Sequence, residues 1–240
     1  MKELYRAIPA ASYIYYSDNA FCPYGDKAPE IIRERAFNIT SLLLSKGAKA
    51  IVVACNTATS AAIKHLRENF DLPFIGMEPA IKPAALGTKS GVIGVLATYG
   101  TLCGVKYLDI KSRYGDKVKV VERVGRGFVE LVENMELEGE RAEKICMESL
   151  RPLLDEGADR IVLGCTHYPF LLPLMEKLVS QMELPQGRPV FINPAPAVAR
   201  RTAEVLGLEP QNAAGATPET ELLSSGDDSN LKKCRELILR

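Results

Sequence analysis

Short apolar runs alternate with amphipathic stretches along this chain. The apolar runs predict strands at 12–16, 50–54, 72–76, 91–97, 117–122, 159–164 and 189–193. Patterns with a helical period predict helices at 29–45, 59–69, 140–157, 169–182 and 230–239, and the proline-rich stretch 207–220 predicts a surface loop. Near-continuous apolar strands between helices are typical of a parallel sheet covered on both faces. The pattern therefore predicts an α/β fold.

One helix–strand unit occurs twice. The segments LLSKGAKAIVVAC (Leu43–Cys55) and LLDEGADRIVLGC (Leu153–Cys165) align without a gap at an offset of 110 residues, with seven of thirteen positions identical. Each consists of a helix end, a glycine, an apolar strand and a cysteine, and polar residues follow both cysteines. Repetition of such a unit predicts two similar lobes.

The repeat places Cys55 and Cys165 at the same structural point, the carboxyl end of a parallel strand. Ligands of α/β sheets bind at this edge, and a helix that starts there stabilises a thiolate. We expect Asn56 or Thr57 to cap the first such helix, and Pro169 to fit the first turn of the second. A single cysteine at a strand end is more often a buried structural residue, but two at matching positions favour catalysis.

Two kinds of chemistry use paired thiols. Disulfide exchange normally uses closely spaced cysteines such as CxxC, and the sequence contains none. The other kind is two-base proton transfer, in which one thiolate removes a proton from a carbon and a second thiol protonates its opposite face. The second kind fits two cysteines in two similar lobes. Cys22, Cys103, Cys146 and Cys234 lack the strand-end context, and we expect them to be structural or incidental.

Composition and charge exclude several other classes. The 240 residues carry 30 basic and 30 acidic side chains without a basic stripe, which argues against a nucleic-acid partner. No apolar run is long enough to span a membrane and the N-terminus has no signal-peptide core, so we expect a cytoplasmic protein with reduced thiols. Two histidines and no CxxC or HExxH motif leave little from which to build a metal site.

Several motifs together resemble the glutamate racemase family of the aspartate/glutamate racemase superfamily. They are VVACNTAT, LGCTHYP and PYG, with DNAFCPYG, IGMEP, GVIGVLAT, VELVENMELEGE, ARRTAEVL and SSGD along the rest of the chain. The resemblance implies two pseudo-symmetric α/β lobes with the active site in the cleft between them. The second lobe would be inserted into the first, which places lobe one at 1–77 plus 187–240 and lobe two at 78–186.

The same resemblance implies a function and a set of site residues. The chain would interconvert L- and D-glutamate without a cofactor or metal, supply D-glutamate for peptidoglycan, and form a homodimer. Cys55 and Cys165 would be the paired acid/base residues. The residues implied to bind substrate are Tyr24, Gly25, Asn56, Thr57, Thr98 and Thr166, and those implied to support them are Pro23, Glu133 and His167.

The chain departs from the family at one place. The family normally begins with a strand that ends in a DSGVGG-type loop, whose Asp and Ser contact the substrate, and this sequence contains no D-S-G. A late start assignment, a truncated sequence or a true loss of the strand would each explain this. Because a missing central strand exposes unpaired backbone groups, we expect the chain as written to be poorly stable and to have little racemase activity.

Two rival functions fit the same motifs. A sibling racemase that acts on aspartate or a hydantoin would use the same pair of cysteines. A non-catalytic relative that binds a ligand or protein partner would keep the fold, and the absent Asp–Ser loop is the feature that favours it.

Overall fold

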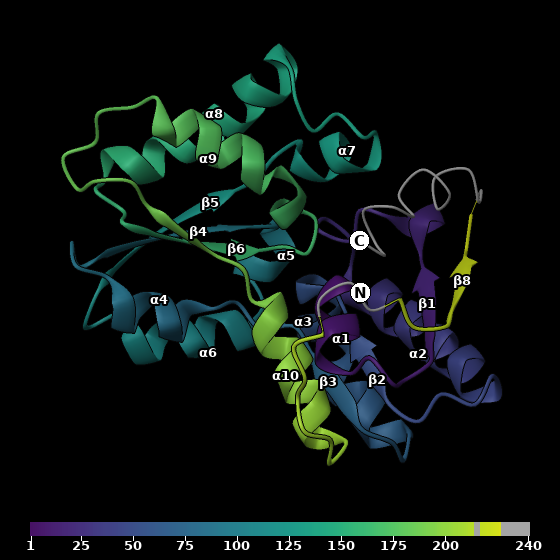
Figure 1. Cartoon of the computed structure of the whole chain (residues 1–240). Coiled ribbons are helices and arrows are strands. Elements are labelled where there is room, and N and C mark those ends of the chain that lie inside the picture. Colours follow the sequence, from purple (N-terminus) through teal and green to yellow (C-terminus); the bar gives the residue numbers. More distant parts are fainter. Residues whose placement is uncertain (214–216, 227–240) are drawn as a thin grey trace. The chain divides into compact units, whose positions relative to one another are not determined.

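The computed structural model describes residues 1–213 and 217–226. The chain divides into two compact units, which we describe separately: the first contains Met1–Met77 and the segment from Ala195 onward, and the second is Glu78–Pro194 (Figure 1). Strands in both units are parallel and lie beside helices. This arrangement confirms the α/β prediction.

The second unit contains one four-stranded parallel sheet. Its strands are β4 (Val92–Ala97), β5 (Lys119–Val124), β6 (Arg160–Gly164) and β7 (Val190–Ile192), in the order β5-β4-β6-β7. From β4 the chain first adds β5 on one side, and it then returns to add β6 on the other side of β4. The strand order therefore reverses between β4 and β6. Such a reversal leaves a crevice at the carboxyl ends of the two strands, where α/β proteins bind ligands.

Helices cover both faces of this sheet. In Figure 1, α4 (Ile81–Gly87) and α6 (Val105–Tyr114) lie on one face, with α8 (Glu140–Asp155) and α9 (Leu172–Ser180) on the other. Ile93, Val95 and Val162 are fully buried against the first pair. On the second face, a Cβ on Gly94 would lie 3.0 Å from the Leu153 side chain, so α8 approaches the strand closely. The core of this unit is built on the two central strands.

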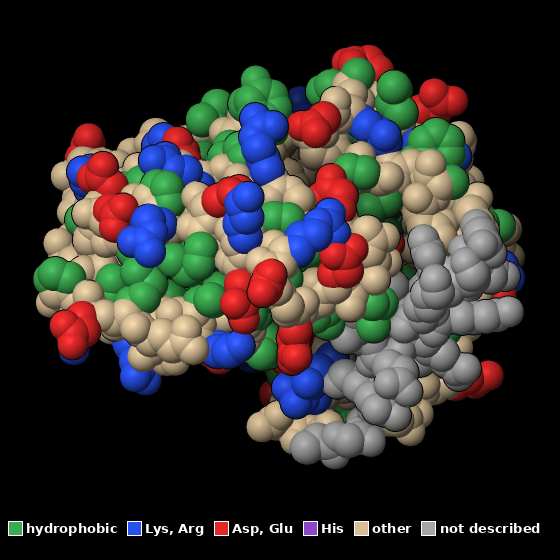
Figure 2. Space-filling model, turned by 90° about the horizontal axis from the view of Figure 1, so that it is seen from above, with side chains coloured by type: hydrophobic (Ala, Val, Ile, Leu, Met, Phe, Trp, Pro, Cys, Tyr) green, Lys and Arg blue, Asp and Glu red, His purple; other side chains and the backbone are tan. Residues whose placement is uncertain are grey.

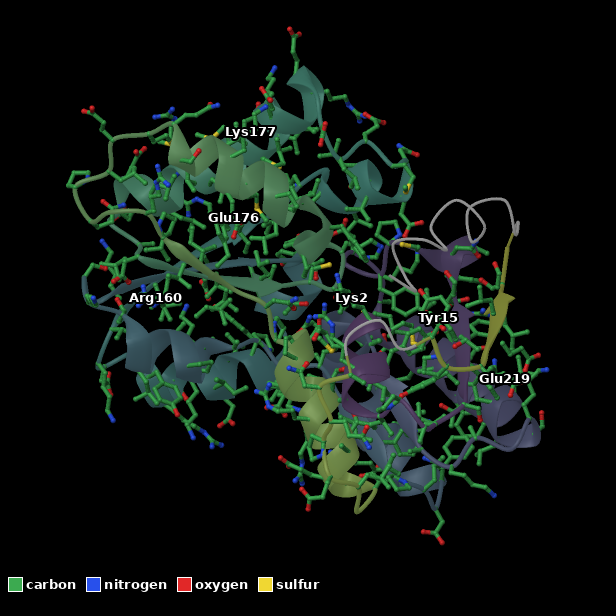
Figure 3. The ribbon with its side chains drawn as sticks, viewed as in Figure 1. Lys2, Tyr15, Arg160, Glu176, Lys177 and Glu219 are labelled. Atoms are coloured by element: carbon green, nitrogen blue, oxygen red, sulfur yellow. The ribbon has the colours of Figure 1, made fainter. Side chains whose placement is uncertain are left out.

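The first unit has two separate strand pairs. β1 (Tyr13–Ser17) pairs with β8 (Thr220–Ser224), and β2 (Ile51–Val53) pairs with β3 (Phe74–Gly76). The side chains of Tyr15 on β1 and Glu219 beside β8 are labelled in Figure 3, and Tyr13 N–H donates to the Glu219 carbonyl at 2.8 Å. Helices α2 (Pro29–Ser45) and α3 (Asn56–Asn69) pack on the second pair around a cluster that includes Leu66. Most strand residues here are only half-buried.

The two copies of the repeat end their helices in the same way. Gly47 and Gly157 both adopt the left-handed conformation, with φ of +87° and +85°. The N–H of Ala48 donates to Leu43 O at 3.0 Å, and that of Ala158 donates to Leu153 O at 3.1 Å. The glycine N–H groups donate to the next carbonyls, Leu44 O and Leu154 O. The two bonds together form the Schellman motif, whose left-handed residue explains why both copies have a glycine here.

Several element boundaries differ from the predictions. The strand β7 pairs with β6, so the second boundary between the units falls between 194 and 195 and not between 186 and 187. The helix predicted at 169–182 divides into a 3₁₀ turn at Tyr168–Leu171 and α9, because Pro169 and Pro173 lack N–H donors. The helix predicted at 230–239 and Cys234 lie outside the described residues.

Other elements were absent from the predictions. The strand β8 reads TELLS, in which polar residues obscure the apolar pattern, and it begins at the last residue of the predicted loop. The apolar pattern also did not predict the helices α1 (Lys2–Ala7), α4, α5 (Tyr99–Leu102), α6, α7 (Phe128–Glu133) and α10 (Ala195–Val205), or the 3₁₀ turn at Asn19–Phe21. Most of them are too short for periodicity to reveal.

Acidic and basic side chains are interspersed on the face drawn in Figure 2, with no large area of one sign. Many of the ion pairs join exposed neighbours, such as Arg113 and Asp109 at 2.7 Å. Among the helices that the structure describes, none has the length and apolar composition needed to cross a membrane.

Candidate active site

Cys55 ends β2 and begins α3. Its backbone is extended, with φ −151° and ψ 125°, and its Sγ accepts a hydrogen bond from Ala58 N–H at 3.4 Å. Cys55 is therefore itself the N-cap of α3, and the prediction that Asn56 or Thr57 caps this helix is wrong. A sulfur in this position lies at the positive end of the helix dipole, which favours a thiolate.

Asn56 directly follows Cys55 and is 4% exposed. Neither Nδ2 nor Oδ1 of its side chain has a hydrogen-bond partner among the described residues. A buried amide without partners costs roughly 1–3 kcal/mol, and a bound ligand commonly satisfies such a group. Thr57, the next residue, is also buried. This helix start is therefore suited to a ligand that both accepts and donates hydrogen bonds.

Tyr24 lies in the loop that follows β1. Its hydroxyl donates to Asp18 Oδ2, and Asp18 also accepts from Arg35 of α2. Burial, followed by the hydrogen bond to Asp18, raises the pKa of Tyr24, and the nearby charge of Cys55 adds to the increase. The tyrosine therefore lies within electrostatic range of the first cysteine. Neither Asp18 nor Arg35 was a sequence candidate.

The rest of this loop has a mixed environment. Pro23 is exposed and follows a cis peptide bond, whereas Gly25 is buried. The carbonyl of Tyr24 accepts from Lys27 N–H at 3.1 Å, which closes a turn around the glycine. The predicted Pro-Tyr-Gly turn is present, and its middle residue is the one linked electrostatically to Cys55.

Cys165 ends β6 in the second unit and is 9% exposed. Ala97 and Gly164 are register partners in β4 and β6, so the residues after them, Thr98 and Cys165, follow neighbouring strand ends. Thr98 caps α5, and its Oγ1 accepts from Thr101 N–H at 3.3 Å. These strand ends are also the point at which the strand order reverses.

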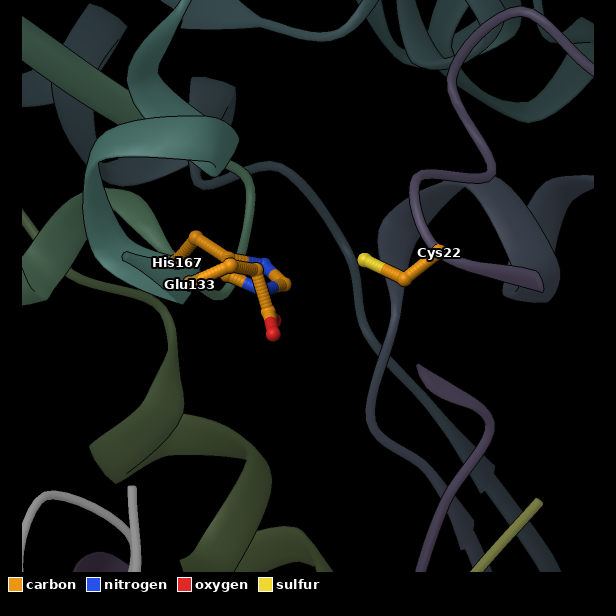
Figure 4. Close-up of side chains that lie close together, drawn as sticks. All are labelled: Cys22, Glu133 and His167. Atoms are coloured by element: carbon orange, nitrogen blue, oxygen red, sulfur yellow. The ribbon is translucent and has the colours of Figure 1, made fainter. Parts of the chain in front are cut away.

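His167 connects Cys165 to an acidic side chain. Its Nδ1 lies 3.9 Å from Cys165 Sγ, and its Nε2 lies 2.7 Å from Glu133 Oε1. Figure 4 shows the imidazole and the carboxyl group side by side; Cys22, also drawn there, belongs to the first unit. An imidazole held between a carboxylate and a thiol can stabilise a thiolate or exchange a proton with it.

Tyr168 fixes the helix that carries Glu133. Its ring is 1% exposed and packs edge-on against Phe128 of α7, with centroids 4.9 Å apart. Its hydroxyl donates to Gly125 O at 3.3 Å, and a Cβ at Gly125 would lie 2.6 Å from that hydroxyl oxygen. Tyr168 was not a sequence candidate, although its position beside His167 in the CTHYP segment could have indicated it.

The structure groups the predicted site residues by unit. At the start of α3 and in the loop after β1 it places Cys55, Asn56, Thr57, Pro23, Tyr24 and Gly25. Near the ends of β4 and β6 it places Thr98, Cys165, Thr166, His167 and Glu133. Cys55 and Cys165 each lie just beyond the carboxyl end of a parallel strand, as the repeat predicts.

The whole chain is similar to known proteins. The Asp/Glu/Hydantoin racemase family model matches residues 1–202. A glutamate racemase of Ectopseudomonas mendocina is 42% identical over 240 residues, covering 100% of this chain and 89% of the relative. A glutamate racemase of Herpetosiphon aurantiacus is 41% identical, covering 99% of this chain and 92% of the relative.

Solved structures are similar as well. A Bacillus anthracis glutamate racemase matches with a TM-score of 0.83 and 30% identity, over 99% of this chain and 87% of that one. An Escherichia coli glutamate racemase solved with L-glutamate and the activator UDP-MurNAc-ala matches with a TM-score of 0.81 and 31% identity, over 98% and 88%. The chain belongs to the Asp/Glu/Hydantoin racemase family.

Proposed function

We propose that this chain interconverts L- and D-glutamate. The observation that carries the proposal is the identity of 42% with a glutamate racemase over the whole chain. The D-glutamate so formed would feed peptidoglycan synthesis. The two strand-end cysteines and the Asn56 amide, which has no partner in the described part of the chain, support a site for a small polar molecule.

The proposed reaction uses Cys55 and Cys165 as paired acid/base residues. One thiolate takes the α-proton, so that the C–H bond breaks and an S–H bond forms. The other thiol then gives its proton to the opposite face of the carbon and becomes a thiolate, which leaves the configuration inverted. Because both proton transfers need hydrogen-bonding reach, the substrate has to be held firmly.

The remaining residues would bind substrate or support the thiols. Buried amide and hydroxyl groups at the start of α3 suit the carboxylate and ammonium groups of an amino acid. His167, backed by Glu133, would assist Cys165. The proposed substrate contacts are Tyr24, Gly25, Asn56, Thr57, Thr98 and Thr166, with Pro23 shaping the loop.

Deuterium incorporation tests this function. In D₂O, circular dichroism should show conversion of either glutamate enantiomer, and mass spectrometry should find deuterium in the early product but not in the remaining substrate. The last result is specific to two bases on opposite faces, because a single base would label both. Turnover of aspartate or a hydantoin without glutamate would favour a sibling racemase, and glutamate binding without turnover would favour a non-catalytic relative.

Two expectations about the whole protein remain predictions. The homodimer implied by the family is tested by light scattering during size-exclusion chromatography, where a monomer at micromolar concentration would contradict it. The expected cytoplasmic location is tested by cell fractionation.

A further inference from the structure

The Asp18 carboxylate is the centre of a hydrogen-bonded cluster in the first unit. It accepts from Arg35 Nε at 3.1 Å and from a second Arg35 nitrogen, and it also accepts from the Tyr24 hydroxyl. The Ser225 side chain, just after β8, also acts to lower the pKa of the Asp18 carboxyl group. The Arg35 guanidinium lies 4.0 Å from the centre of the Phe21 ring, a cation–π contact that holds it in place. Both charged side chains are largely buried, with 10% of Asp18 and 22% of Arg35 exposed.

These contacts keep Asp18 ionised. Burial acts to raise its pKa, but the hydrogen bonds from Arg35 and Tyr24 outweigh burial and hold the pKa below its ordinary value. An ionised carboxylate can only accept hydrogen bonds, so the single proton of the Tyr24 hydroxyl has to point toward it. The Tyr24 oxygen can then only accept from any further group.

We infer that Asp18 is a positioning residue, which fixes the hydrogen-bond polarity of Tyr24 so that its oxygen accepts from the ammonium group of the amino-acid substrate. The inference rests on the proposed function, since it needs a substrate beside Cys55 and Tyr24. An ammonium group has only donors and a carboxylate only acceptors, so a Tyr24 oxygen of this polarity binds the first and rejects the second. Arg35 acts through Asp18.

Kinetics with glutamate and inhibition by glutarate test this assignment. Glutarate has both carboxylates of glutamate but no ammonium group. The Asp18→Asn variant should raise KM for D-glutamate about tenfold, as expected for loss of one hydrogen bond to a charged group. Its kcat should change less, by roughly twofold, and the inhibition constant of glutarate should stay within about twofold of wild type. An equal weakening of glutarate would show a general disturbance of the site and overturn the inference.

A double-mutant cycle tests whether Asp18 acts through Tyr24. Tyr24→Phe should also raise KM for glutamate and spare glutarate, and adding Asp18→Asn to it should change KM little further. Additive effects of the two changes would overturn the inference. The control is Glu221→Gln, which breaks the ion pair of Lys46 and Glu221 at 2.6 Å between the end of α2 and β8 and should leave both constants unchanged.

Two further measurements cover the cases in which Asp18→Asn does not fold or the wild type does not turn glutamate over. If Asp18→Asn does not fold, Arg35→Lys keeps the charge but loses the two-nitrogen contact, and it should give a smaller rise in KM with glutarate unaffected. If the wild type does not turn glutamate over, the proposed function fails, while calorimetry of D-glutamate and glutarate still tests the inference. Tighter binding of glutamate than of glutarate that depends on Asp18 would support it, and equal or absent binding would overturn it.

Discussion

The two copies of the helix–strand–cysteine unit begin alike and end differently. Both pass through a left-handed glycine into a parallel strand that ends in a cysteine. Beyond the cysteine, the first copy enters a regular helix that Cys55 itself caps, whereas the second makes a turn and a 3₁₀ segment before α9. The two copies therefore share the helix end, the glycine turn and the strand, and they differ in the residues that surround each sulfur.

The divergence gives each sulfur a different environment. Cys55 Sγ is supported by a backbone N–H at the start of α3, and Cys165 Sγ lies beside the His167 imidazole. The strands that carry them also differ, because β6 is almost fully buried within four strands and β2 is half-buried in a pair. Sequence repetition therefore does not make the two thiols equivalent, and each can be disturbed separately.

Removal of either thiol gives the largest expected effect. Cys55→Ser and Cys165→Ser should each lower kcat/KM for glutamate on the order of 10²–10⁴-fold, the usual contribution of an acid/base group. The control is Cys103→Ser, because Cys103 is exposed and should be silent. Activity is measured by circular dichroism, and full activity of both test variants would contradict the two-thiol mechanism.

An exchange of the residue before each cysteine tests the difference in packing. Gly164 is buried, and a Cβ there would lie 2.8 Å from Ala97 Cβ and 3.0 Å from Leu96 O, whereas the matching Ala54 is exposed. Gly164→Ala should therefore destabilise the protein by about 1–3 kcal/mol through overpacking. Ala54→Gly should cost only about 0.5–1 kcal/mol through backbone entropy. Urea denaturation gives both values, and equal costs would show that the two strand ends pack alike.

Loss of the Glu133 carboxylate should impair Cys165 through His167 and leave the surroundings of Cys55 unchanged. Glu133→Gln keeps the shape of the side chain but removes the charge beside His167 Nε2. Activity should fall about tenfold, as when a group that orients an acid/base residue is lost. The control, Glu143→Gln, breaks the pair with Lys177 of α9 (labelled in Figure 3), whose atoms lie 3.0 Å apart, and should be silent. Equal effects of the two variants would indicate nonspecific destabilisation.

The sequence predicts the scaffold of this protein better than the contacts around its cysteines. The predicted bounds of α2 match the structure, because apolar periodicity indicates the helix and Pro29 and Gly47 mark where it starts and stops. The repeat predicted that each cysteine lies just beyond a strand, because the ends of strands and helices depend largely on local sequence. It could not predict that Asp18 bonds to Arg35, since that contact depends on how β1 and α2 pack.

Caps were also hard to predict. A cysteine is an unusual N-cap, and the preference for Asn or Thr gave the wrong residue at the start of α3. Glu133 and His167 lie 34 positions apart in sequence, so no local pattern predicts that their side chains meet. Only the family resemblance indicated that both belong to the site. Local rules therefore predicted the elements, and tertiary contacts decided the site.

The smallest expected effect concerns Asp159, whose counterpart in the first copy is the exposed Lys49. Asp159 is buried and accepts from Thr88 Oγ1 and Lys89 N–H, both at 2.6 Å. Burial raises its pKa, but these hydrogen bonds together hold the pKa below the ordinary 3.8. Its contribution to stability is therefore complete above about pH 4 and is lost as the pH falls through the lower folded-state pKa.

Asp159→Asn should accordingly cost about 1 kcal/mol at pH 7, since the amide oxygen keeps part of the hydrogen bonding. The difference from wild type should shrink when urea denaturation is repeated at pH values that fall from about 4 through the lowered folded-state pKa, because Asp159 then becomes protonated and neutral, as Asn is. Lys49→Gln, the matched change in the first copy, should stay within roughly 0.5 kcal/mol at every pH. A cost of Asp159→Asn that is independent of pH would mean that hydrogen-bond geometry, and not charge, anchors the start of β6.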